Sequence, residues 1–103
     1  MTTAARRPPA PAWAPSERAV ILRLVAEHGA SEPRVFGSVA RGEAGEDSDL
    51  DLLVKAGPDT SAWFPAGLIQ DLEALLGCRV DVVTEGALHW ALRDRILREA
   101  VPL

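Results

Sequence analysis

Apolar residues recur along the chain with two different periods, and these periods predict its secondary structure. Three stretches repeat apolar side chains every three or four residues, as amphipathic helices do: 16–28, 65–76 and about 87–99. Three shorter stretches are apolar or alternate between apolar and polar positions, which is typical of strands: 34–36, 49–55 and 79–84. One helical turn is expected at 39–41, between the first two strands.

The order of these elements predicts the fold class. Helices alternate with strands, which indicates an α/β (α+β) fold with a small mixed three-stranded sheet flanked by helices. The helix at 65–76 should carry the chain from strand 49–55 to strand 79–84, so that these two strands are parallel. The first fifteen residues hold four of the eight prolines. We expect them to form a flexible tail, which leaves residues 16–103 as one domain.

Composition narrows the possible functions. The uninterrupted apolar runs are only a few residues long, so no membrane span is expected. A net charge of −4 argues against a broad basic face, and direct nucleic-acid binding is not expected. Cys78 is the one cysteine, which favours a reducing cytoplasm. The acidic residues are unevenly placed, because five of the fifteen lie between positions 43 and 51.

Within this acidic stretch, Asp49 and Asp51 are two positions apart on a predicted strand. Their side chains should share one face, while Leu50 and Leu52 point into the core. Two carboxylates at close range repel each other, and a divalent cation removes the repulsion. Oxygen ligands without a His or Cys cluster favour Mg²⁺ or Mn²⁺ over Zn²⁺. Asp81 lies in the next strand, and strand spacing would bring it beside the pair, which predicts a two-metal site.

A second group of residues precedes the aspartates. Gly37-Ser38 follows a strand and precedes a helical turn, where backbone N–H groups collect phosphate oxygens. Glycine allows close approach to a ligand, and Ser38 adds a hydroxyl donor. Arg41 lies one turn further on the same side, and its guanidinium can hold phosphate oxygens in a bidentate manner. Taken singly, these features have plainer alternatives: an ordinary turn, a solvated arginine, solvated aspartates and an Asp81 that protects an edge strand.

Two residue types outside these motifs, tryptophan and arginine, have structural interpretations. Trp63 and Trp90 are expected to be core or interface anchors rather than stacking platforms for a base. The last helix should have a basic side, which is either solvated or faces an acidic partner: Arg93, Arg95 and Arg98.

Together, the two motifs resemble the signature of the polymerase-beta-like nucleotidyltransferase superfamily. That signature is Gly-Ser, ten residues and Asp-x-Asp, and it matches GSVARGEAGEDSDLD from Gly37 to Asp51. Asp81, in RVDVV, matches the third carboxylate of the superfamily. The compact chain and its last residues, ILREAVPL, are similar to the minimal nucleotidyltransferase branch. The resemblance therefore implies a nucleotidyltransferase fold over residues 16–103.

The resemblance also implies a reaction. Asp49 and Asp51 would hold Mg²⁺ on the triphosphate of ATP, and two ions are expected once Asp81 is included. The β- and γ-phosphates would be held by the phosphate-binding loop, through Gly37, Ser38, Arg41 and backbone N–H groups near Ser48. Asp81 would activate an acceptor hydroxyl, as a metal ligand or as a base. Attack on the α-phosphate would then transfer the nucleotide and release pyrophosphate.

Finally, the resemblance implies a partner protein. Larger relatives hold the acceptor with an additional domain, for which this chain has no room, so a second protein is expected. Minimal nucleotidyltransferases are typically encoded beside a HEPN-family ribonuclease toxin, and AMP transfer to that toxin would make this chain an antitoxin. Two alternatives stay open: an antitoxin that neutralises the toxin by binding alone, and a transferase for a small molecule such as an aminoglycoside.

Overall fold

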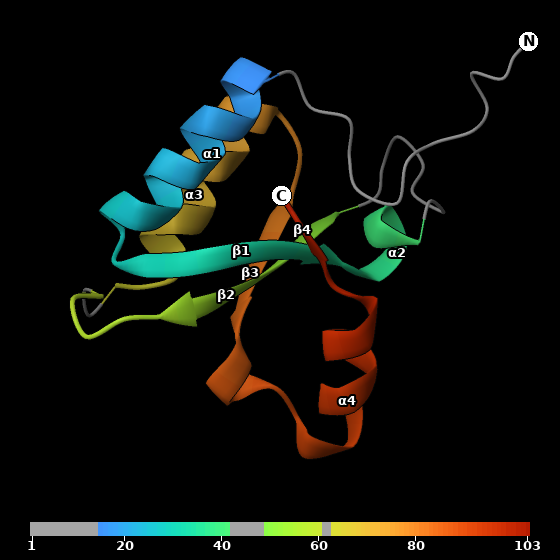
Figure 1. The fold of residues 1–103 in the computed structure, drawn as a ribbon. Coiled ribbons are helices and arrows are strands. Elements are labelled where there is room, and N and C mark those ends of the chain that lie inside the picture. Colours follow the sequence, from blue (N-terminus) through green and yellow to red (C-terminus); the bar gives the residue numbers. More distant parts are fainter. Residues whose placement is uncertain (1–14, 42–48, 61–62) are drawn as a thin grey trace, which may run out of the picture.

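The computed structural model describes residues 15–41, 49–60 and 63–103, which are arranged around one sheet (Figure 1). The elements follow in the order α1 (Pro15–Glu27), β1 (Ala30–Phe36), α2 (Gly37–Ala40), β2 (Leu50–Ala56), α3 (Ala66–Leu76), β3 (Val80–Thr84), the 3-10 turn η2 (Glu85–Ala87), α4 (Trp90–Glu99) and β4 (Val101–Pro102). The predicted fold class is confirmed. No helix in these ranges is both long enough and apolar enough to cross a membrane.

The sheet of the described residues has four strands, in the order β3-β2-β1-β4, which is one more than predicted. β2 and β3 are parallel, as expected from the helix that joins them, and β1 is antiparallel to both β2 and β4. β4 is two residues long, so no hydrophobic period could reveal it. β1 begins at Ala30 rather than at Arg34, and its register shifts between Ser31 and Arg34. Pro33 interrupts the strand pattern there, because proline has no N–H for the ladder.

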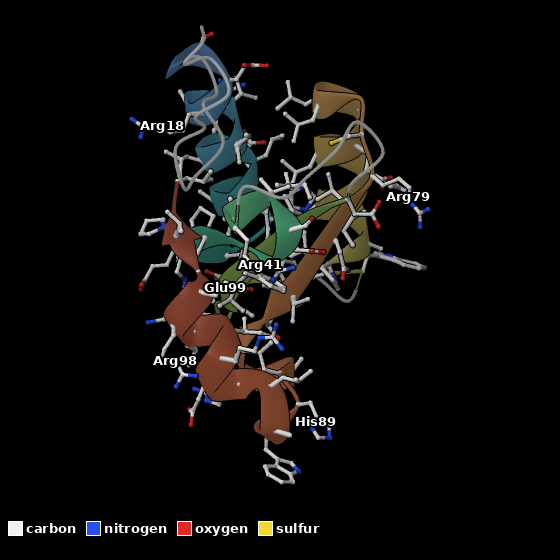
Figure 2. All side chains as sticks on the ribbon, turned by 90° about the vertical axis from the view of Figure 1, so that its right-hand side faces the viewer. Arg18, Arg41, Arg79, His89, Arg98 and Glu99 are labelled. Carbon is white, nitrogen blue, oxygen red and sulfur yellow. The ribbon has the colours of Figure 1, made fainter. Side chains whose placement is uncertain are left out.

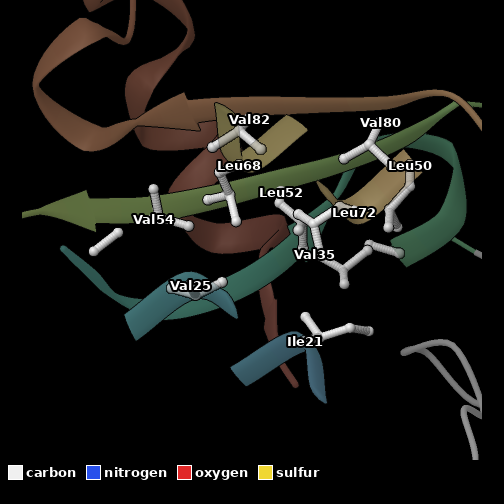
Figure 3. Close-up of a cluster of buried hydrophobic side chains, with 12 residues drawn as sticks. Ile21, Val25, Val35, Leu50, Leu52, Val54, Leu68, Leu72, Val80 and Val82 are labelled. Atoms are coloured by element: carbon white, nitrogen blue, oxygen red, sulfur yellow. The ribbon is translucent and has the colours of Figure 1, made fainter. Parts of the chain in front are cut away.

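The two faces of the sheet differ because successive side chains of a strand point in opposite directions. α1 and α3 lie side by side on one face (Figure 1). They enclose a core with alternate residues of the strands (Figure 3): Ile21, Val25, Val35, Leu50, Leu52, Val54, Leu68, Leu72, Val80 and Val82. The expected burial of Leu50 and Leu52 is confirmed, with 4% and 0% exposed. Asp51 and Asp81 alternate with these core residues, so they point to the opposite face, where α4 lies (Figure 1).

The last helix lies at the surface. α4 begins at Trp90, later than predicted, and the His89 ring accepts a hydrogen bond from the Ala91 N–H. Residues 90–95 are all exposed, and only the C-terminal turn of α4 is partly buried. Trp63 and Trp90 are 79% and 83% exposed, so neither belongs to the core, and their role as interface anchors stays a prediction.

Candidate functional site

Two of the three predicted carboxylates are brought together by strand register. In the parallel pairing of β2 with β3, Asp51 is the partner of Asp81, and register partners present their side chains on the same face. Asp49 lies just before β2, half-exposed, with Oδ1 3.7 Å from Nε of Arg79. The predicted juxtaposition of Asp81 with the Asp-x-Asp segment is therefore confirmed.

The charge at this point of the sheet is concentrated and partly buried. Burial raises the pKa of Asp51, and the carboxylates of Asp81 and Asp49 raise it further, while the Arg41 guanidinium opposes them. Within the described ranges, no three acidic, His or Cys side chains converge on a single point as a ready metal site. The donor set nevertheless fits Mg²⁺, since it consists of carboxylate oxygens whose mutual repulsion a cation would relieve.

The glycine of the predicted phosphate loop lies against the same carboxylate. β1 runs directly into α2, and Gly37 has φ +76°, a value that strains residues with a side chain. A Cβ at this position would also collide with Oδ2 of Asp51. The register explains the contact, because Phe36, the residue before Gly37, pairs with Asp51 across the antiparallel strands. The turn and the acidic pair therefore form one site.

The remaining predicted loop residues are placed as follows. Ser38 lies in the first turn of α2 and is partly buried. Arg41 ends α2, and its backbone N–H donates to the Gly37 carbonyl, 3.1 Å away. Ser48 lies outside the described residues. The short helical turn after β1 therefore contains all three residues: Gly37, Ser38 and Arg41.

A residue that the sequence analysis missed joins this turn from α4. Glu99 accepts a hydrogen bond at Oε2 from the Gly37 N–H, 2.9 Å away, and its Oε1 lies 2.8 Å from Nη1 of Arg41. Figure 2 shows Arg41 and Glu99 directed toward one another from α2 and α4. Burial alone would raise the pKa of Glu99, but the bonds from Arg41 and Gly37 outweigh it and lower that pKa.

One feature of the sequence could have identified Glu99, which was not among the predicted site residues. The residue lies in the last turn of α4, where the helix dipole disfavours a carboxylate. A residue that breaks a local rule often serves a site elsewhere in the fold. Its partners could not be found from the sequence, because they depend on where α4 ends relative to β1.

The mixed sheet, the glycine turn and the paired carboxylates define the class of the protein as a nucleotidyltransferase. The sequence profile described as "Nucleotidyltransferase domain" matches residues 19–103. The chain therefore belongs to the nucleotidyltransferase domain family, as the Gly-Ser and Asp-x-Asp pattern predicted.

Relatives and solved structures refine this placement. Protein adenylyltransferase MntA of Thermococcus cleftensis is 47% identical over 73 residues, which cover 71% of this chain and 74% of the relative. A Methanocaldococcus jannaschii protein named "Putative protein adenylyltransferase MJ0435" is 43% identical over 81 residues, 79% of this chain and 87% of the relative. A solved structure described as a "putative minimal nucleotidyltransferase" is 55% identical, with a TM-score of 0.76 over 85% of this chain and 90% of that chain.

A more distant structure shares the fold alone. The crystal structure of a toxin-antitoxin with AMP-PNP is 23% identical, with a TM-score of 0.69 over 84% of this chain and 70% of that chain.

Proposed function

We propose that the chain transfers AMP from ATP to a hydroxyl group of a HEPN-family toxin protein and thereby acts as its antitoxin. The contact between the Gly37 turn and the Asp51–Asp81 pair carries the proposal. A nucleoside triphosphate needs donors for its phosphate oxygens beside carboxylates for its metal ions, and this site offers both. The adenine nucleotide is supported by the relative from Thermococcus cleftensis, which is named a protein adenylyltransferase.

The phosphate-binding turn positions the nucleotide. The backbone at Gly37, the Ser38 hydroxyl and the Arg41 guanidinium bind the β- and γ-phosphates, with Ser48 as a further loop residue. A triphosphate fixed at this end presents its α-phosphorus toward the acidic pair, which converts the transfer into a reaction between oriented groups. Because the phosphate donors are held by the fold before the ligand arrives, little reorganisation is needed on binding.

The carboxylates serve the reacting end. Asp49, Asp51 and Asp81 would hold Mg²⁺, with two ions expected, and the metal would neutralise negative charge on the phosphates. Asp81 would activate the acceptor hydroxyl, either as a ligand of the metal that lowers the pKa of this hydroxyl or as the base that takes its proton. The acceptor oxygen forms a bond to the α-phosphorus while the bond from that phosphorus to the bridging oxygen breaks, so pyrophosphate leaves. The product is an AMP ester of the partner.

The partner is proposed on the strength of the relatives. Solved structures of the toxin-antitoxin MntA-HepT share the fold of this chain, with a TM-score of 0.63 at 19% identity. The proposed acceptor is a hydroxyl, which Asp81 would activate as a metal ligand or as a base. The candidate acceptor protein is a HEPN protein encoded beside this chain.

Radiolabelled ATP tests the proposed reaction. The purified chain, the HEPN protein and Mg²⁺ are incubated with ATP labelled in either the α- or the γ-phosphate. The α-label should become covalently attached to the HEPN protein, and the γ-label should appear in pyrophosphate. Attachment of the γ-label would identify a kinase instead, and attachment of neither would reject AMP transfer to this partner.

A further inference from the structure

Glu99 connects the end of α4 to the turn that binds phosphate in the proposed function. We propose that Glu99 is a positioning residue, which holds the Arg41 guanidinium and the Gly37 turn in the geometry that receives the ATP phosphates. The inference rests on the proposed function, because it assigns Glu99 to the same nucleotide site. Glu99 itself contacts the two protein groups and not the nucleotide.

The short strand β4 determines where Glu99 lies. β4 pairs antiparallel with β1, with Val101 opposite Val35 and Pro102 opposite Arg34. Continuing that register two residues further along β1, and two residues back from β4, places Gly37 opposite Glu99. The hydrogen bond from the Gly37 N–H to Glu99 Oε2, at 2.9 Å, agrees with this placement. The two-residue strand therefore aligns a carboxylate of α4 with the turn after β1.

Both oxygens of this carboxylate are engaged. Oε2 accepts from the Gly37 backbone, and Oε1 accepts from Nη1 of Arg41 at 2.8 Å, while the Glu99 side chain is only 16% exposed. An incoming phosphate that displaced Glu99 would leave a mostly buried carboxylate without these donors, which is unfavourable. Glu99 is therefore expected to keep both hydrogen bonds when the nucleotide binds.

The geometry of a guanidinium allows Arg41 to contact two anions. Its five N–H donors form a planar fork, so a bond from Nη1 to Glu99 is compatible with a phosphate at another edge. Gly37, whose N–H donates to Glu99, also lies against the Asp51 carboxylate, so Glu99 and the acidic pair flank the same turn as Arg41. Arginine loses much side-chain freedom when it is fixed, and Glu99 accounts for part of that ordering before the ligand binds.

Calorimetry with AMP-PNP and Mg²⁺ tests the inference on the full chain. Glu99→Ala should raise the Kd of AMP-PNP about tenfold, which corresponds to the loss of one hydrogen bond to a charged group. Glu99→Gln keeps an acceptor without the charge and should give an intermediate Kd. Asp94→Ala removes a carboxylate from the exposed side of the same helix and should leave the Kd unchanged. An unchanged Kd in Glu99→Ala overturns the inference, and a lower Kd would instead make Glu99 a competitor of phosphate.

A double-mutant cycle tests whether Glu99 acts through Arg41. In an Arg41→Ala background, Glu99→Ala should raise the Kd much less than it does in the wild-type background, because the two residues then act as one unit. Equal effects in both backgrounds would reject the positioning role. In transfer assays the Glu99→Ala loss should fall on the KM for ATP more than on kcat, since the phosphates are held before and during the reaction.

The two levels of proposal can fail separately. If wild-type protein binds AMP-PNP in a Glu99-dependent manner but transfers no AMP, the proposed transfer is rejected and the role of Glu99 in nucleotide binding stands. If wild-type protein transfers AMP while Glu99→Ala and Glu99→Gln bind as wild type does, only the role of Glu99 is rejected. Wild-type protein that fails to bind AMP-PNP overturns both.

Discussion

Asp51 of β2 and Asp81 of β3 are register partners, so their carboxylates leave the parallel strands side by side on the face opposite the main core. The pKa of Asp51 is raised by burial and by both neighbouring aspartates. A triphosphate would add several more negative charges at this point. Repulsion of this size requires a cation as counter-charge.

Removal of divalent metal should therefore abolish tight nucleotide binding. Calorimetry of ATP binding in Mg²⁺ and in excess EDTA measures the effect directly, with monovalent salt held constant to keep screening equal. We expect strong binding only with Mg²⁺ or Mn²⁺. Undiminished affinity in EDTA would show that the three aspartates are not a metal site.

Arg41 should contribute directly to the affinity for ATP. Loss of a charge-assisted phosphate contact costs about 1.5–3 kcal/mol, so Arg41→Ala should weaken ATP binding roughly tenfold or more. Arg18→Ala removes an exposed arginine from α1, away from the site (Figure 2), and provides the matched control. Equal dissociation constants for the two variants would mean that Arg41 does not bind the ATP phosphates.

Gly37 should be required both for its left-handed backbone and for its close approach to Asp51. A comparison with Gly77 separates these two effects. Gly37 and Gly77 both have left-handed φ values, +76° and +69°, but a Cβ meets nothing within 4 Å at Gly77 and collides with Asp51 at Gly37. Gly77→Ala should lose about 1–2 kcal/mol of stability through backbone strain alone. Gly37→Ala should lose a similar amount of stability, because the Asp51 carboxylate can turn aside, but it should also lose ATP binding, since that carboxylate is then displaced; thermal unfolding and calorimetry measure the two effects. Normal ATP binding by Gly37→Ala would contradict the close approach of the turn to Asp51.

The ion pair between Arg34 and Glu85 should make stability depend on pH. The hydrogen bond from Arg34 holds the pKa of Glu85 below its ordinary value of 4.5. A carboxyl with a depressed folded-state pKa stabilises the protein above its unfolded-state pKa, and this contribution is lost as the pH falls through the folded-state value. The difference in Tm between wild type and Glu85→Gln should thus be present at pH 7 and shrink below about pH 4.5. A difference that grows as the solution becomes more acidic would reverse the assigned sign.

Much of the candidate site could be predicted because it depends on local sequence. The alternation around Asp49 and Asp51 set the faces of β2, and the connecting helix made β3 its parallel neighbour. Gly37 could be identified because a glycine between a strand and a helical turn indicates a backbone conformation that other residues adopt only with strain.

The rest depended on contacts between distant parts of the chain. β4 is too short for a periodic signal, and Glu99 is informative only once β4 is paired with β1. Trp63 and Trp90 were expected to be anchors because large aromatic side chains usually bury most of their surface. Their exposure follows from positions before α3 and at the start of α4, outside the layer where the two core helices meet the sheet.

The central claim is that this site transfers AMP to a partner protein, and the intact mass of that partner tests it most directly. The chain is mixed with the proposed HEPN-family partner, ATP and Mg²⁺, and the mixture is analysed by mass spectrometry. The account predicts one or more AMP additions on the partner with wild-type chain, and none with the Asp49→Asn, Asp51→Asn double variant, whose metal site has lost two of its three carboxylates. Neutralisation of the partner by both proteins without any added mass would contradict the account and identify an antitoxin that acts by binding alone.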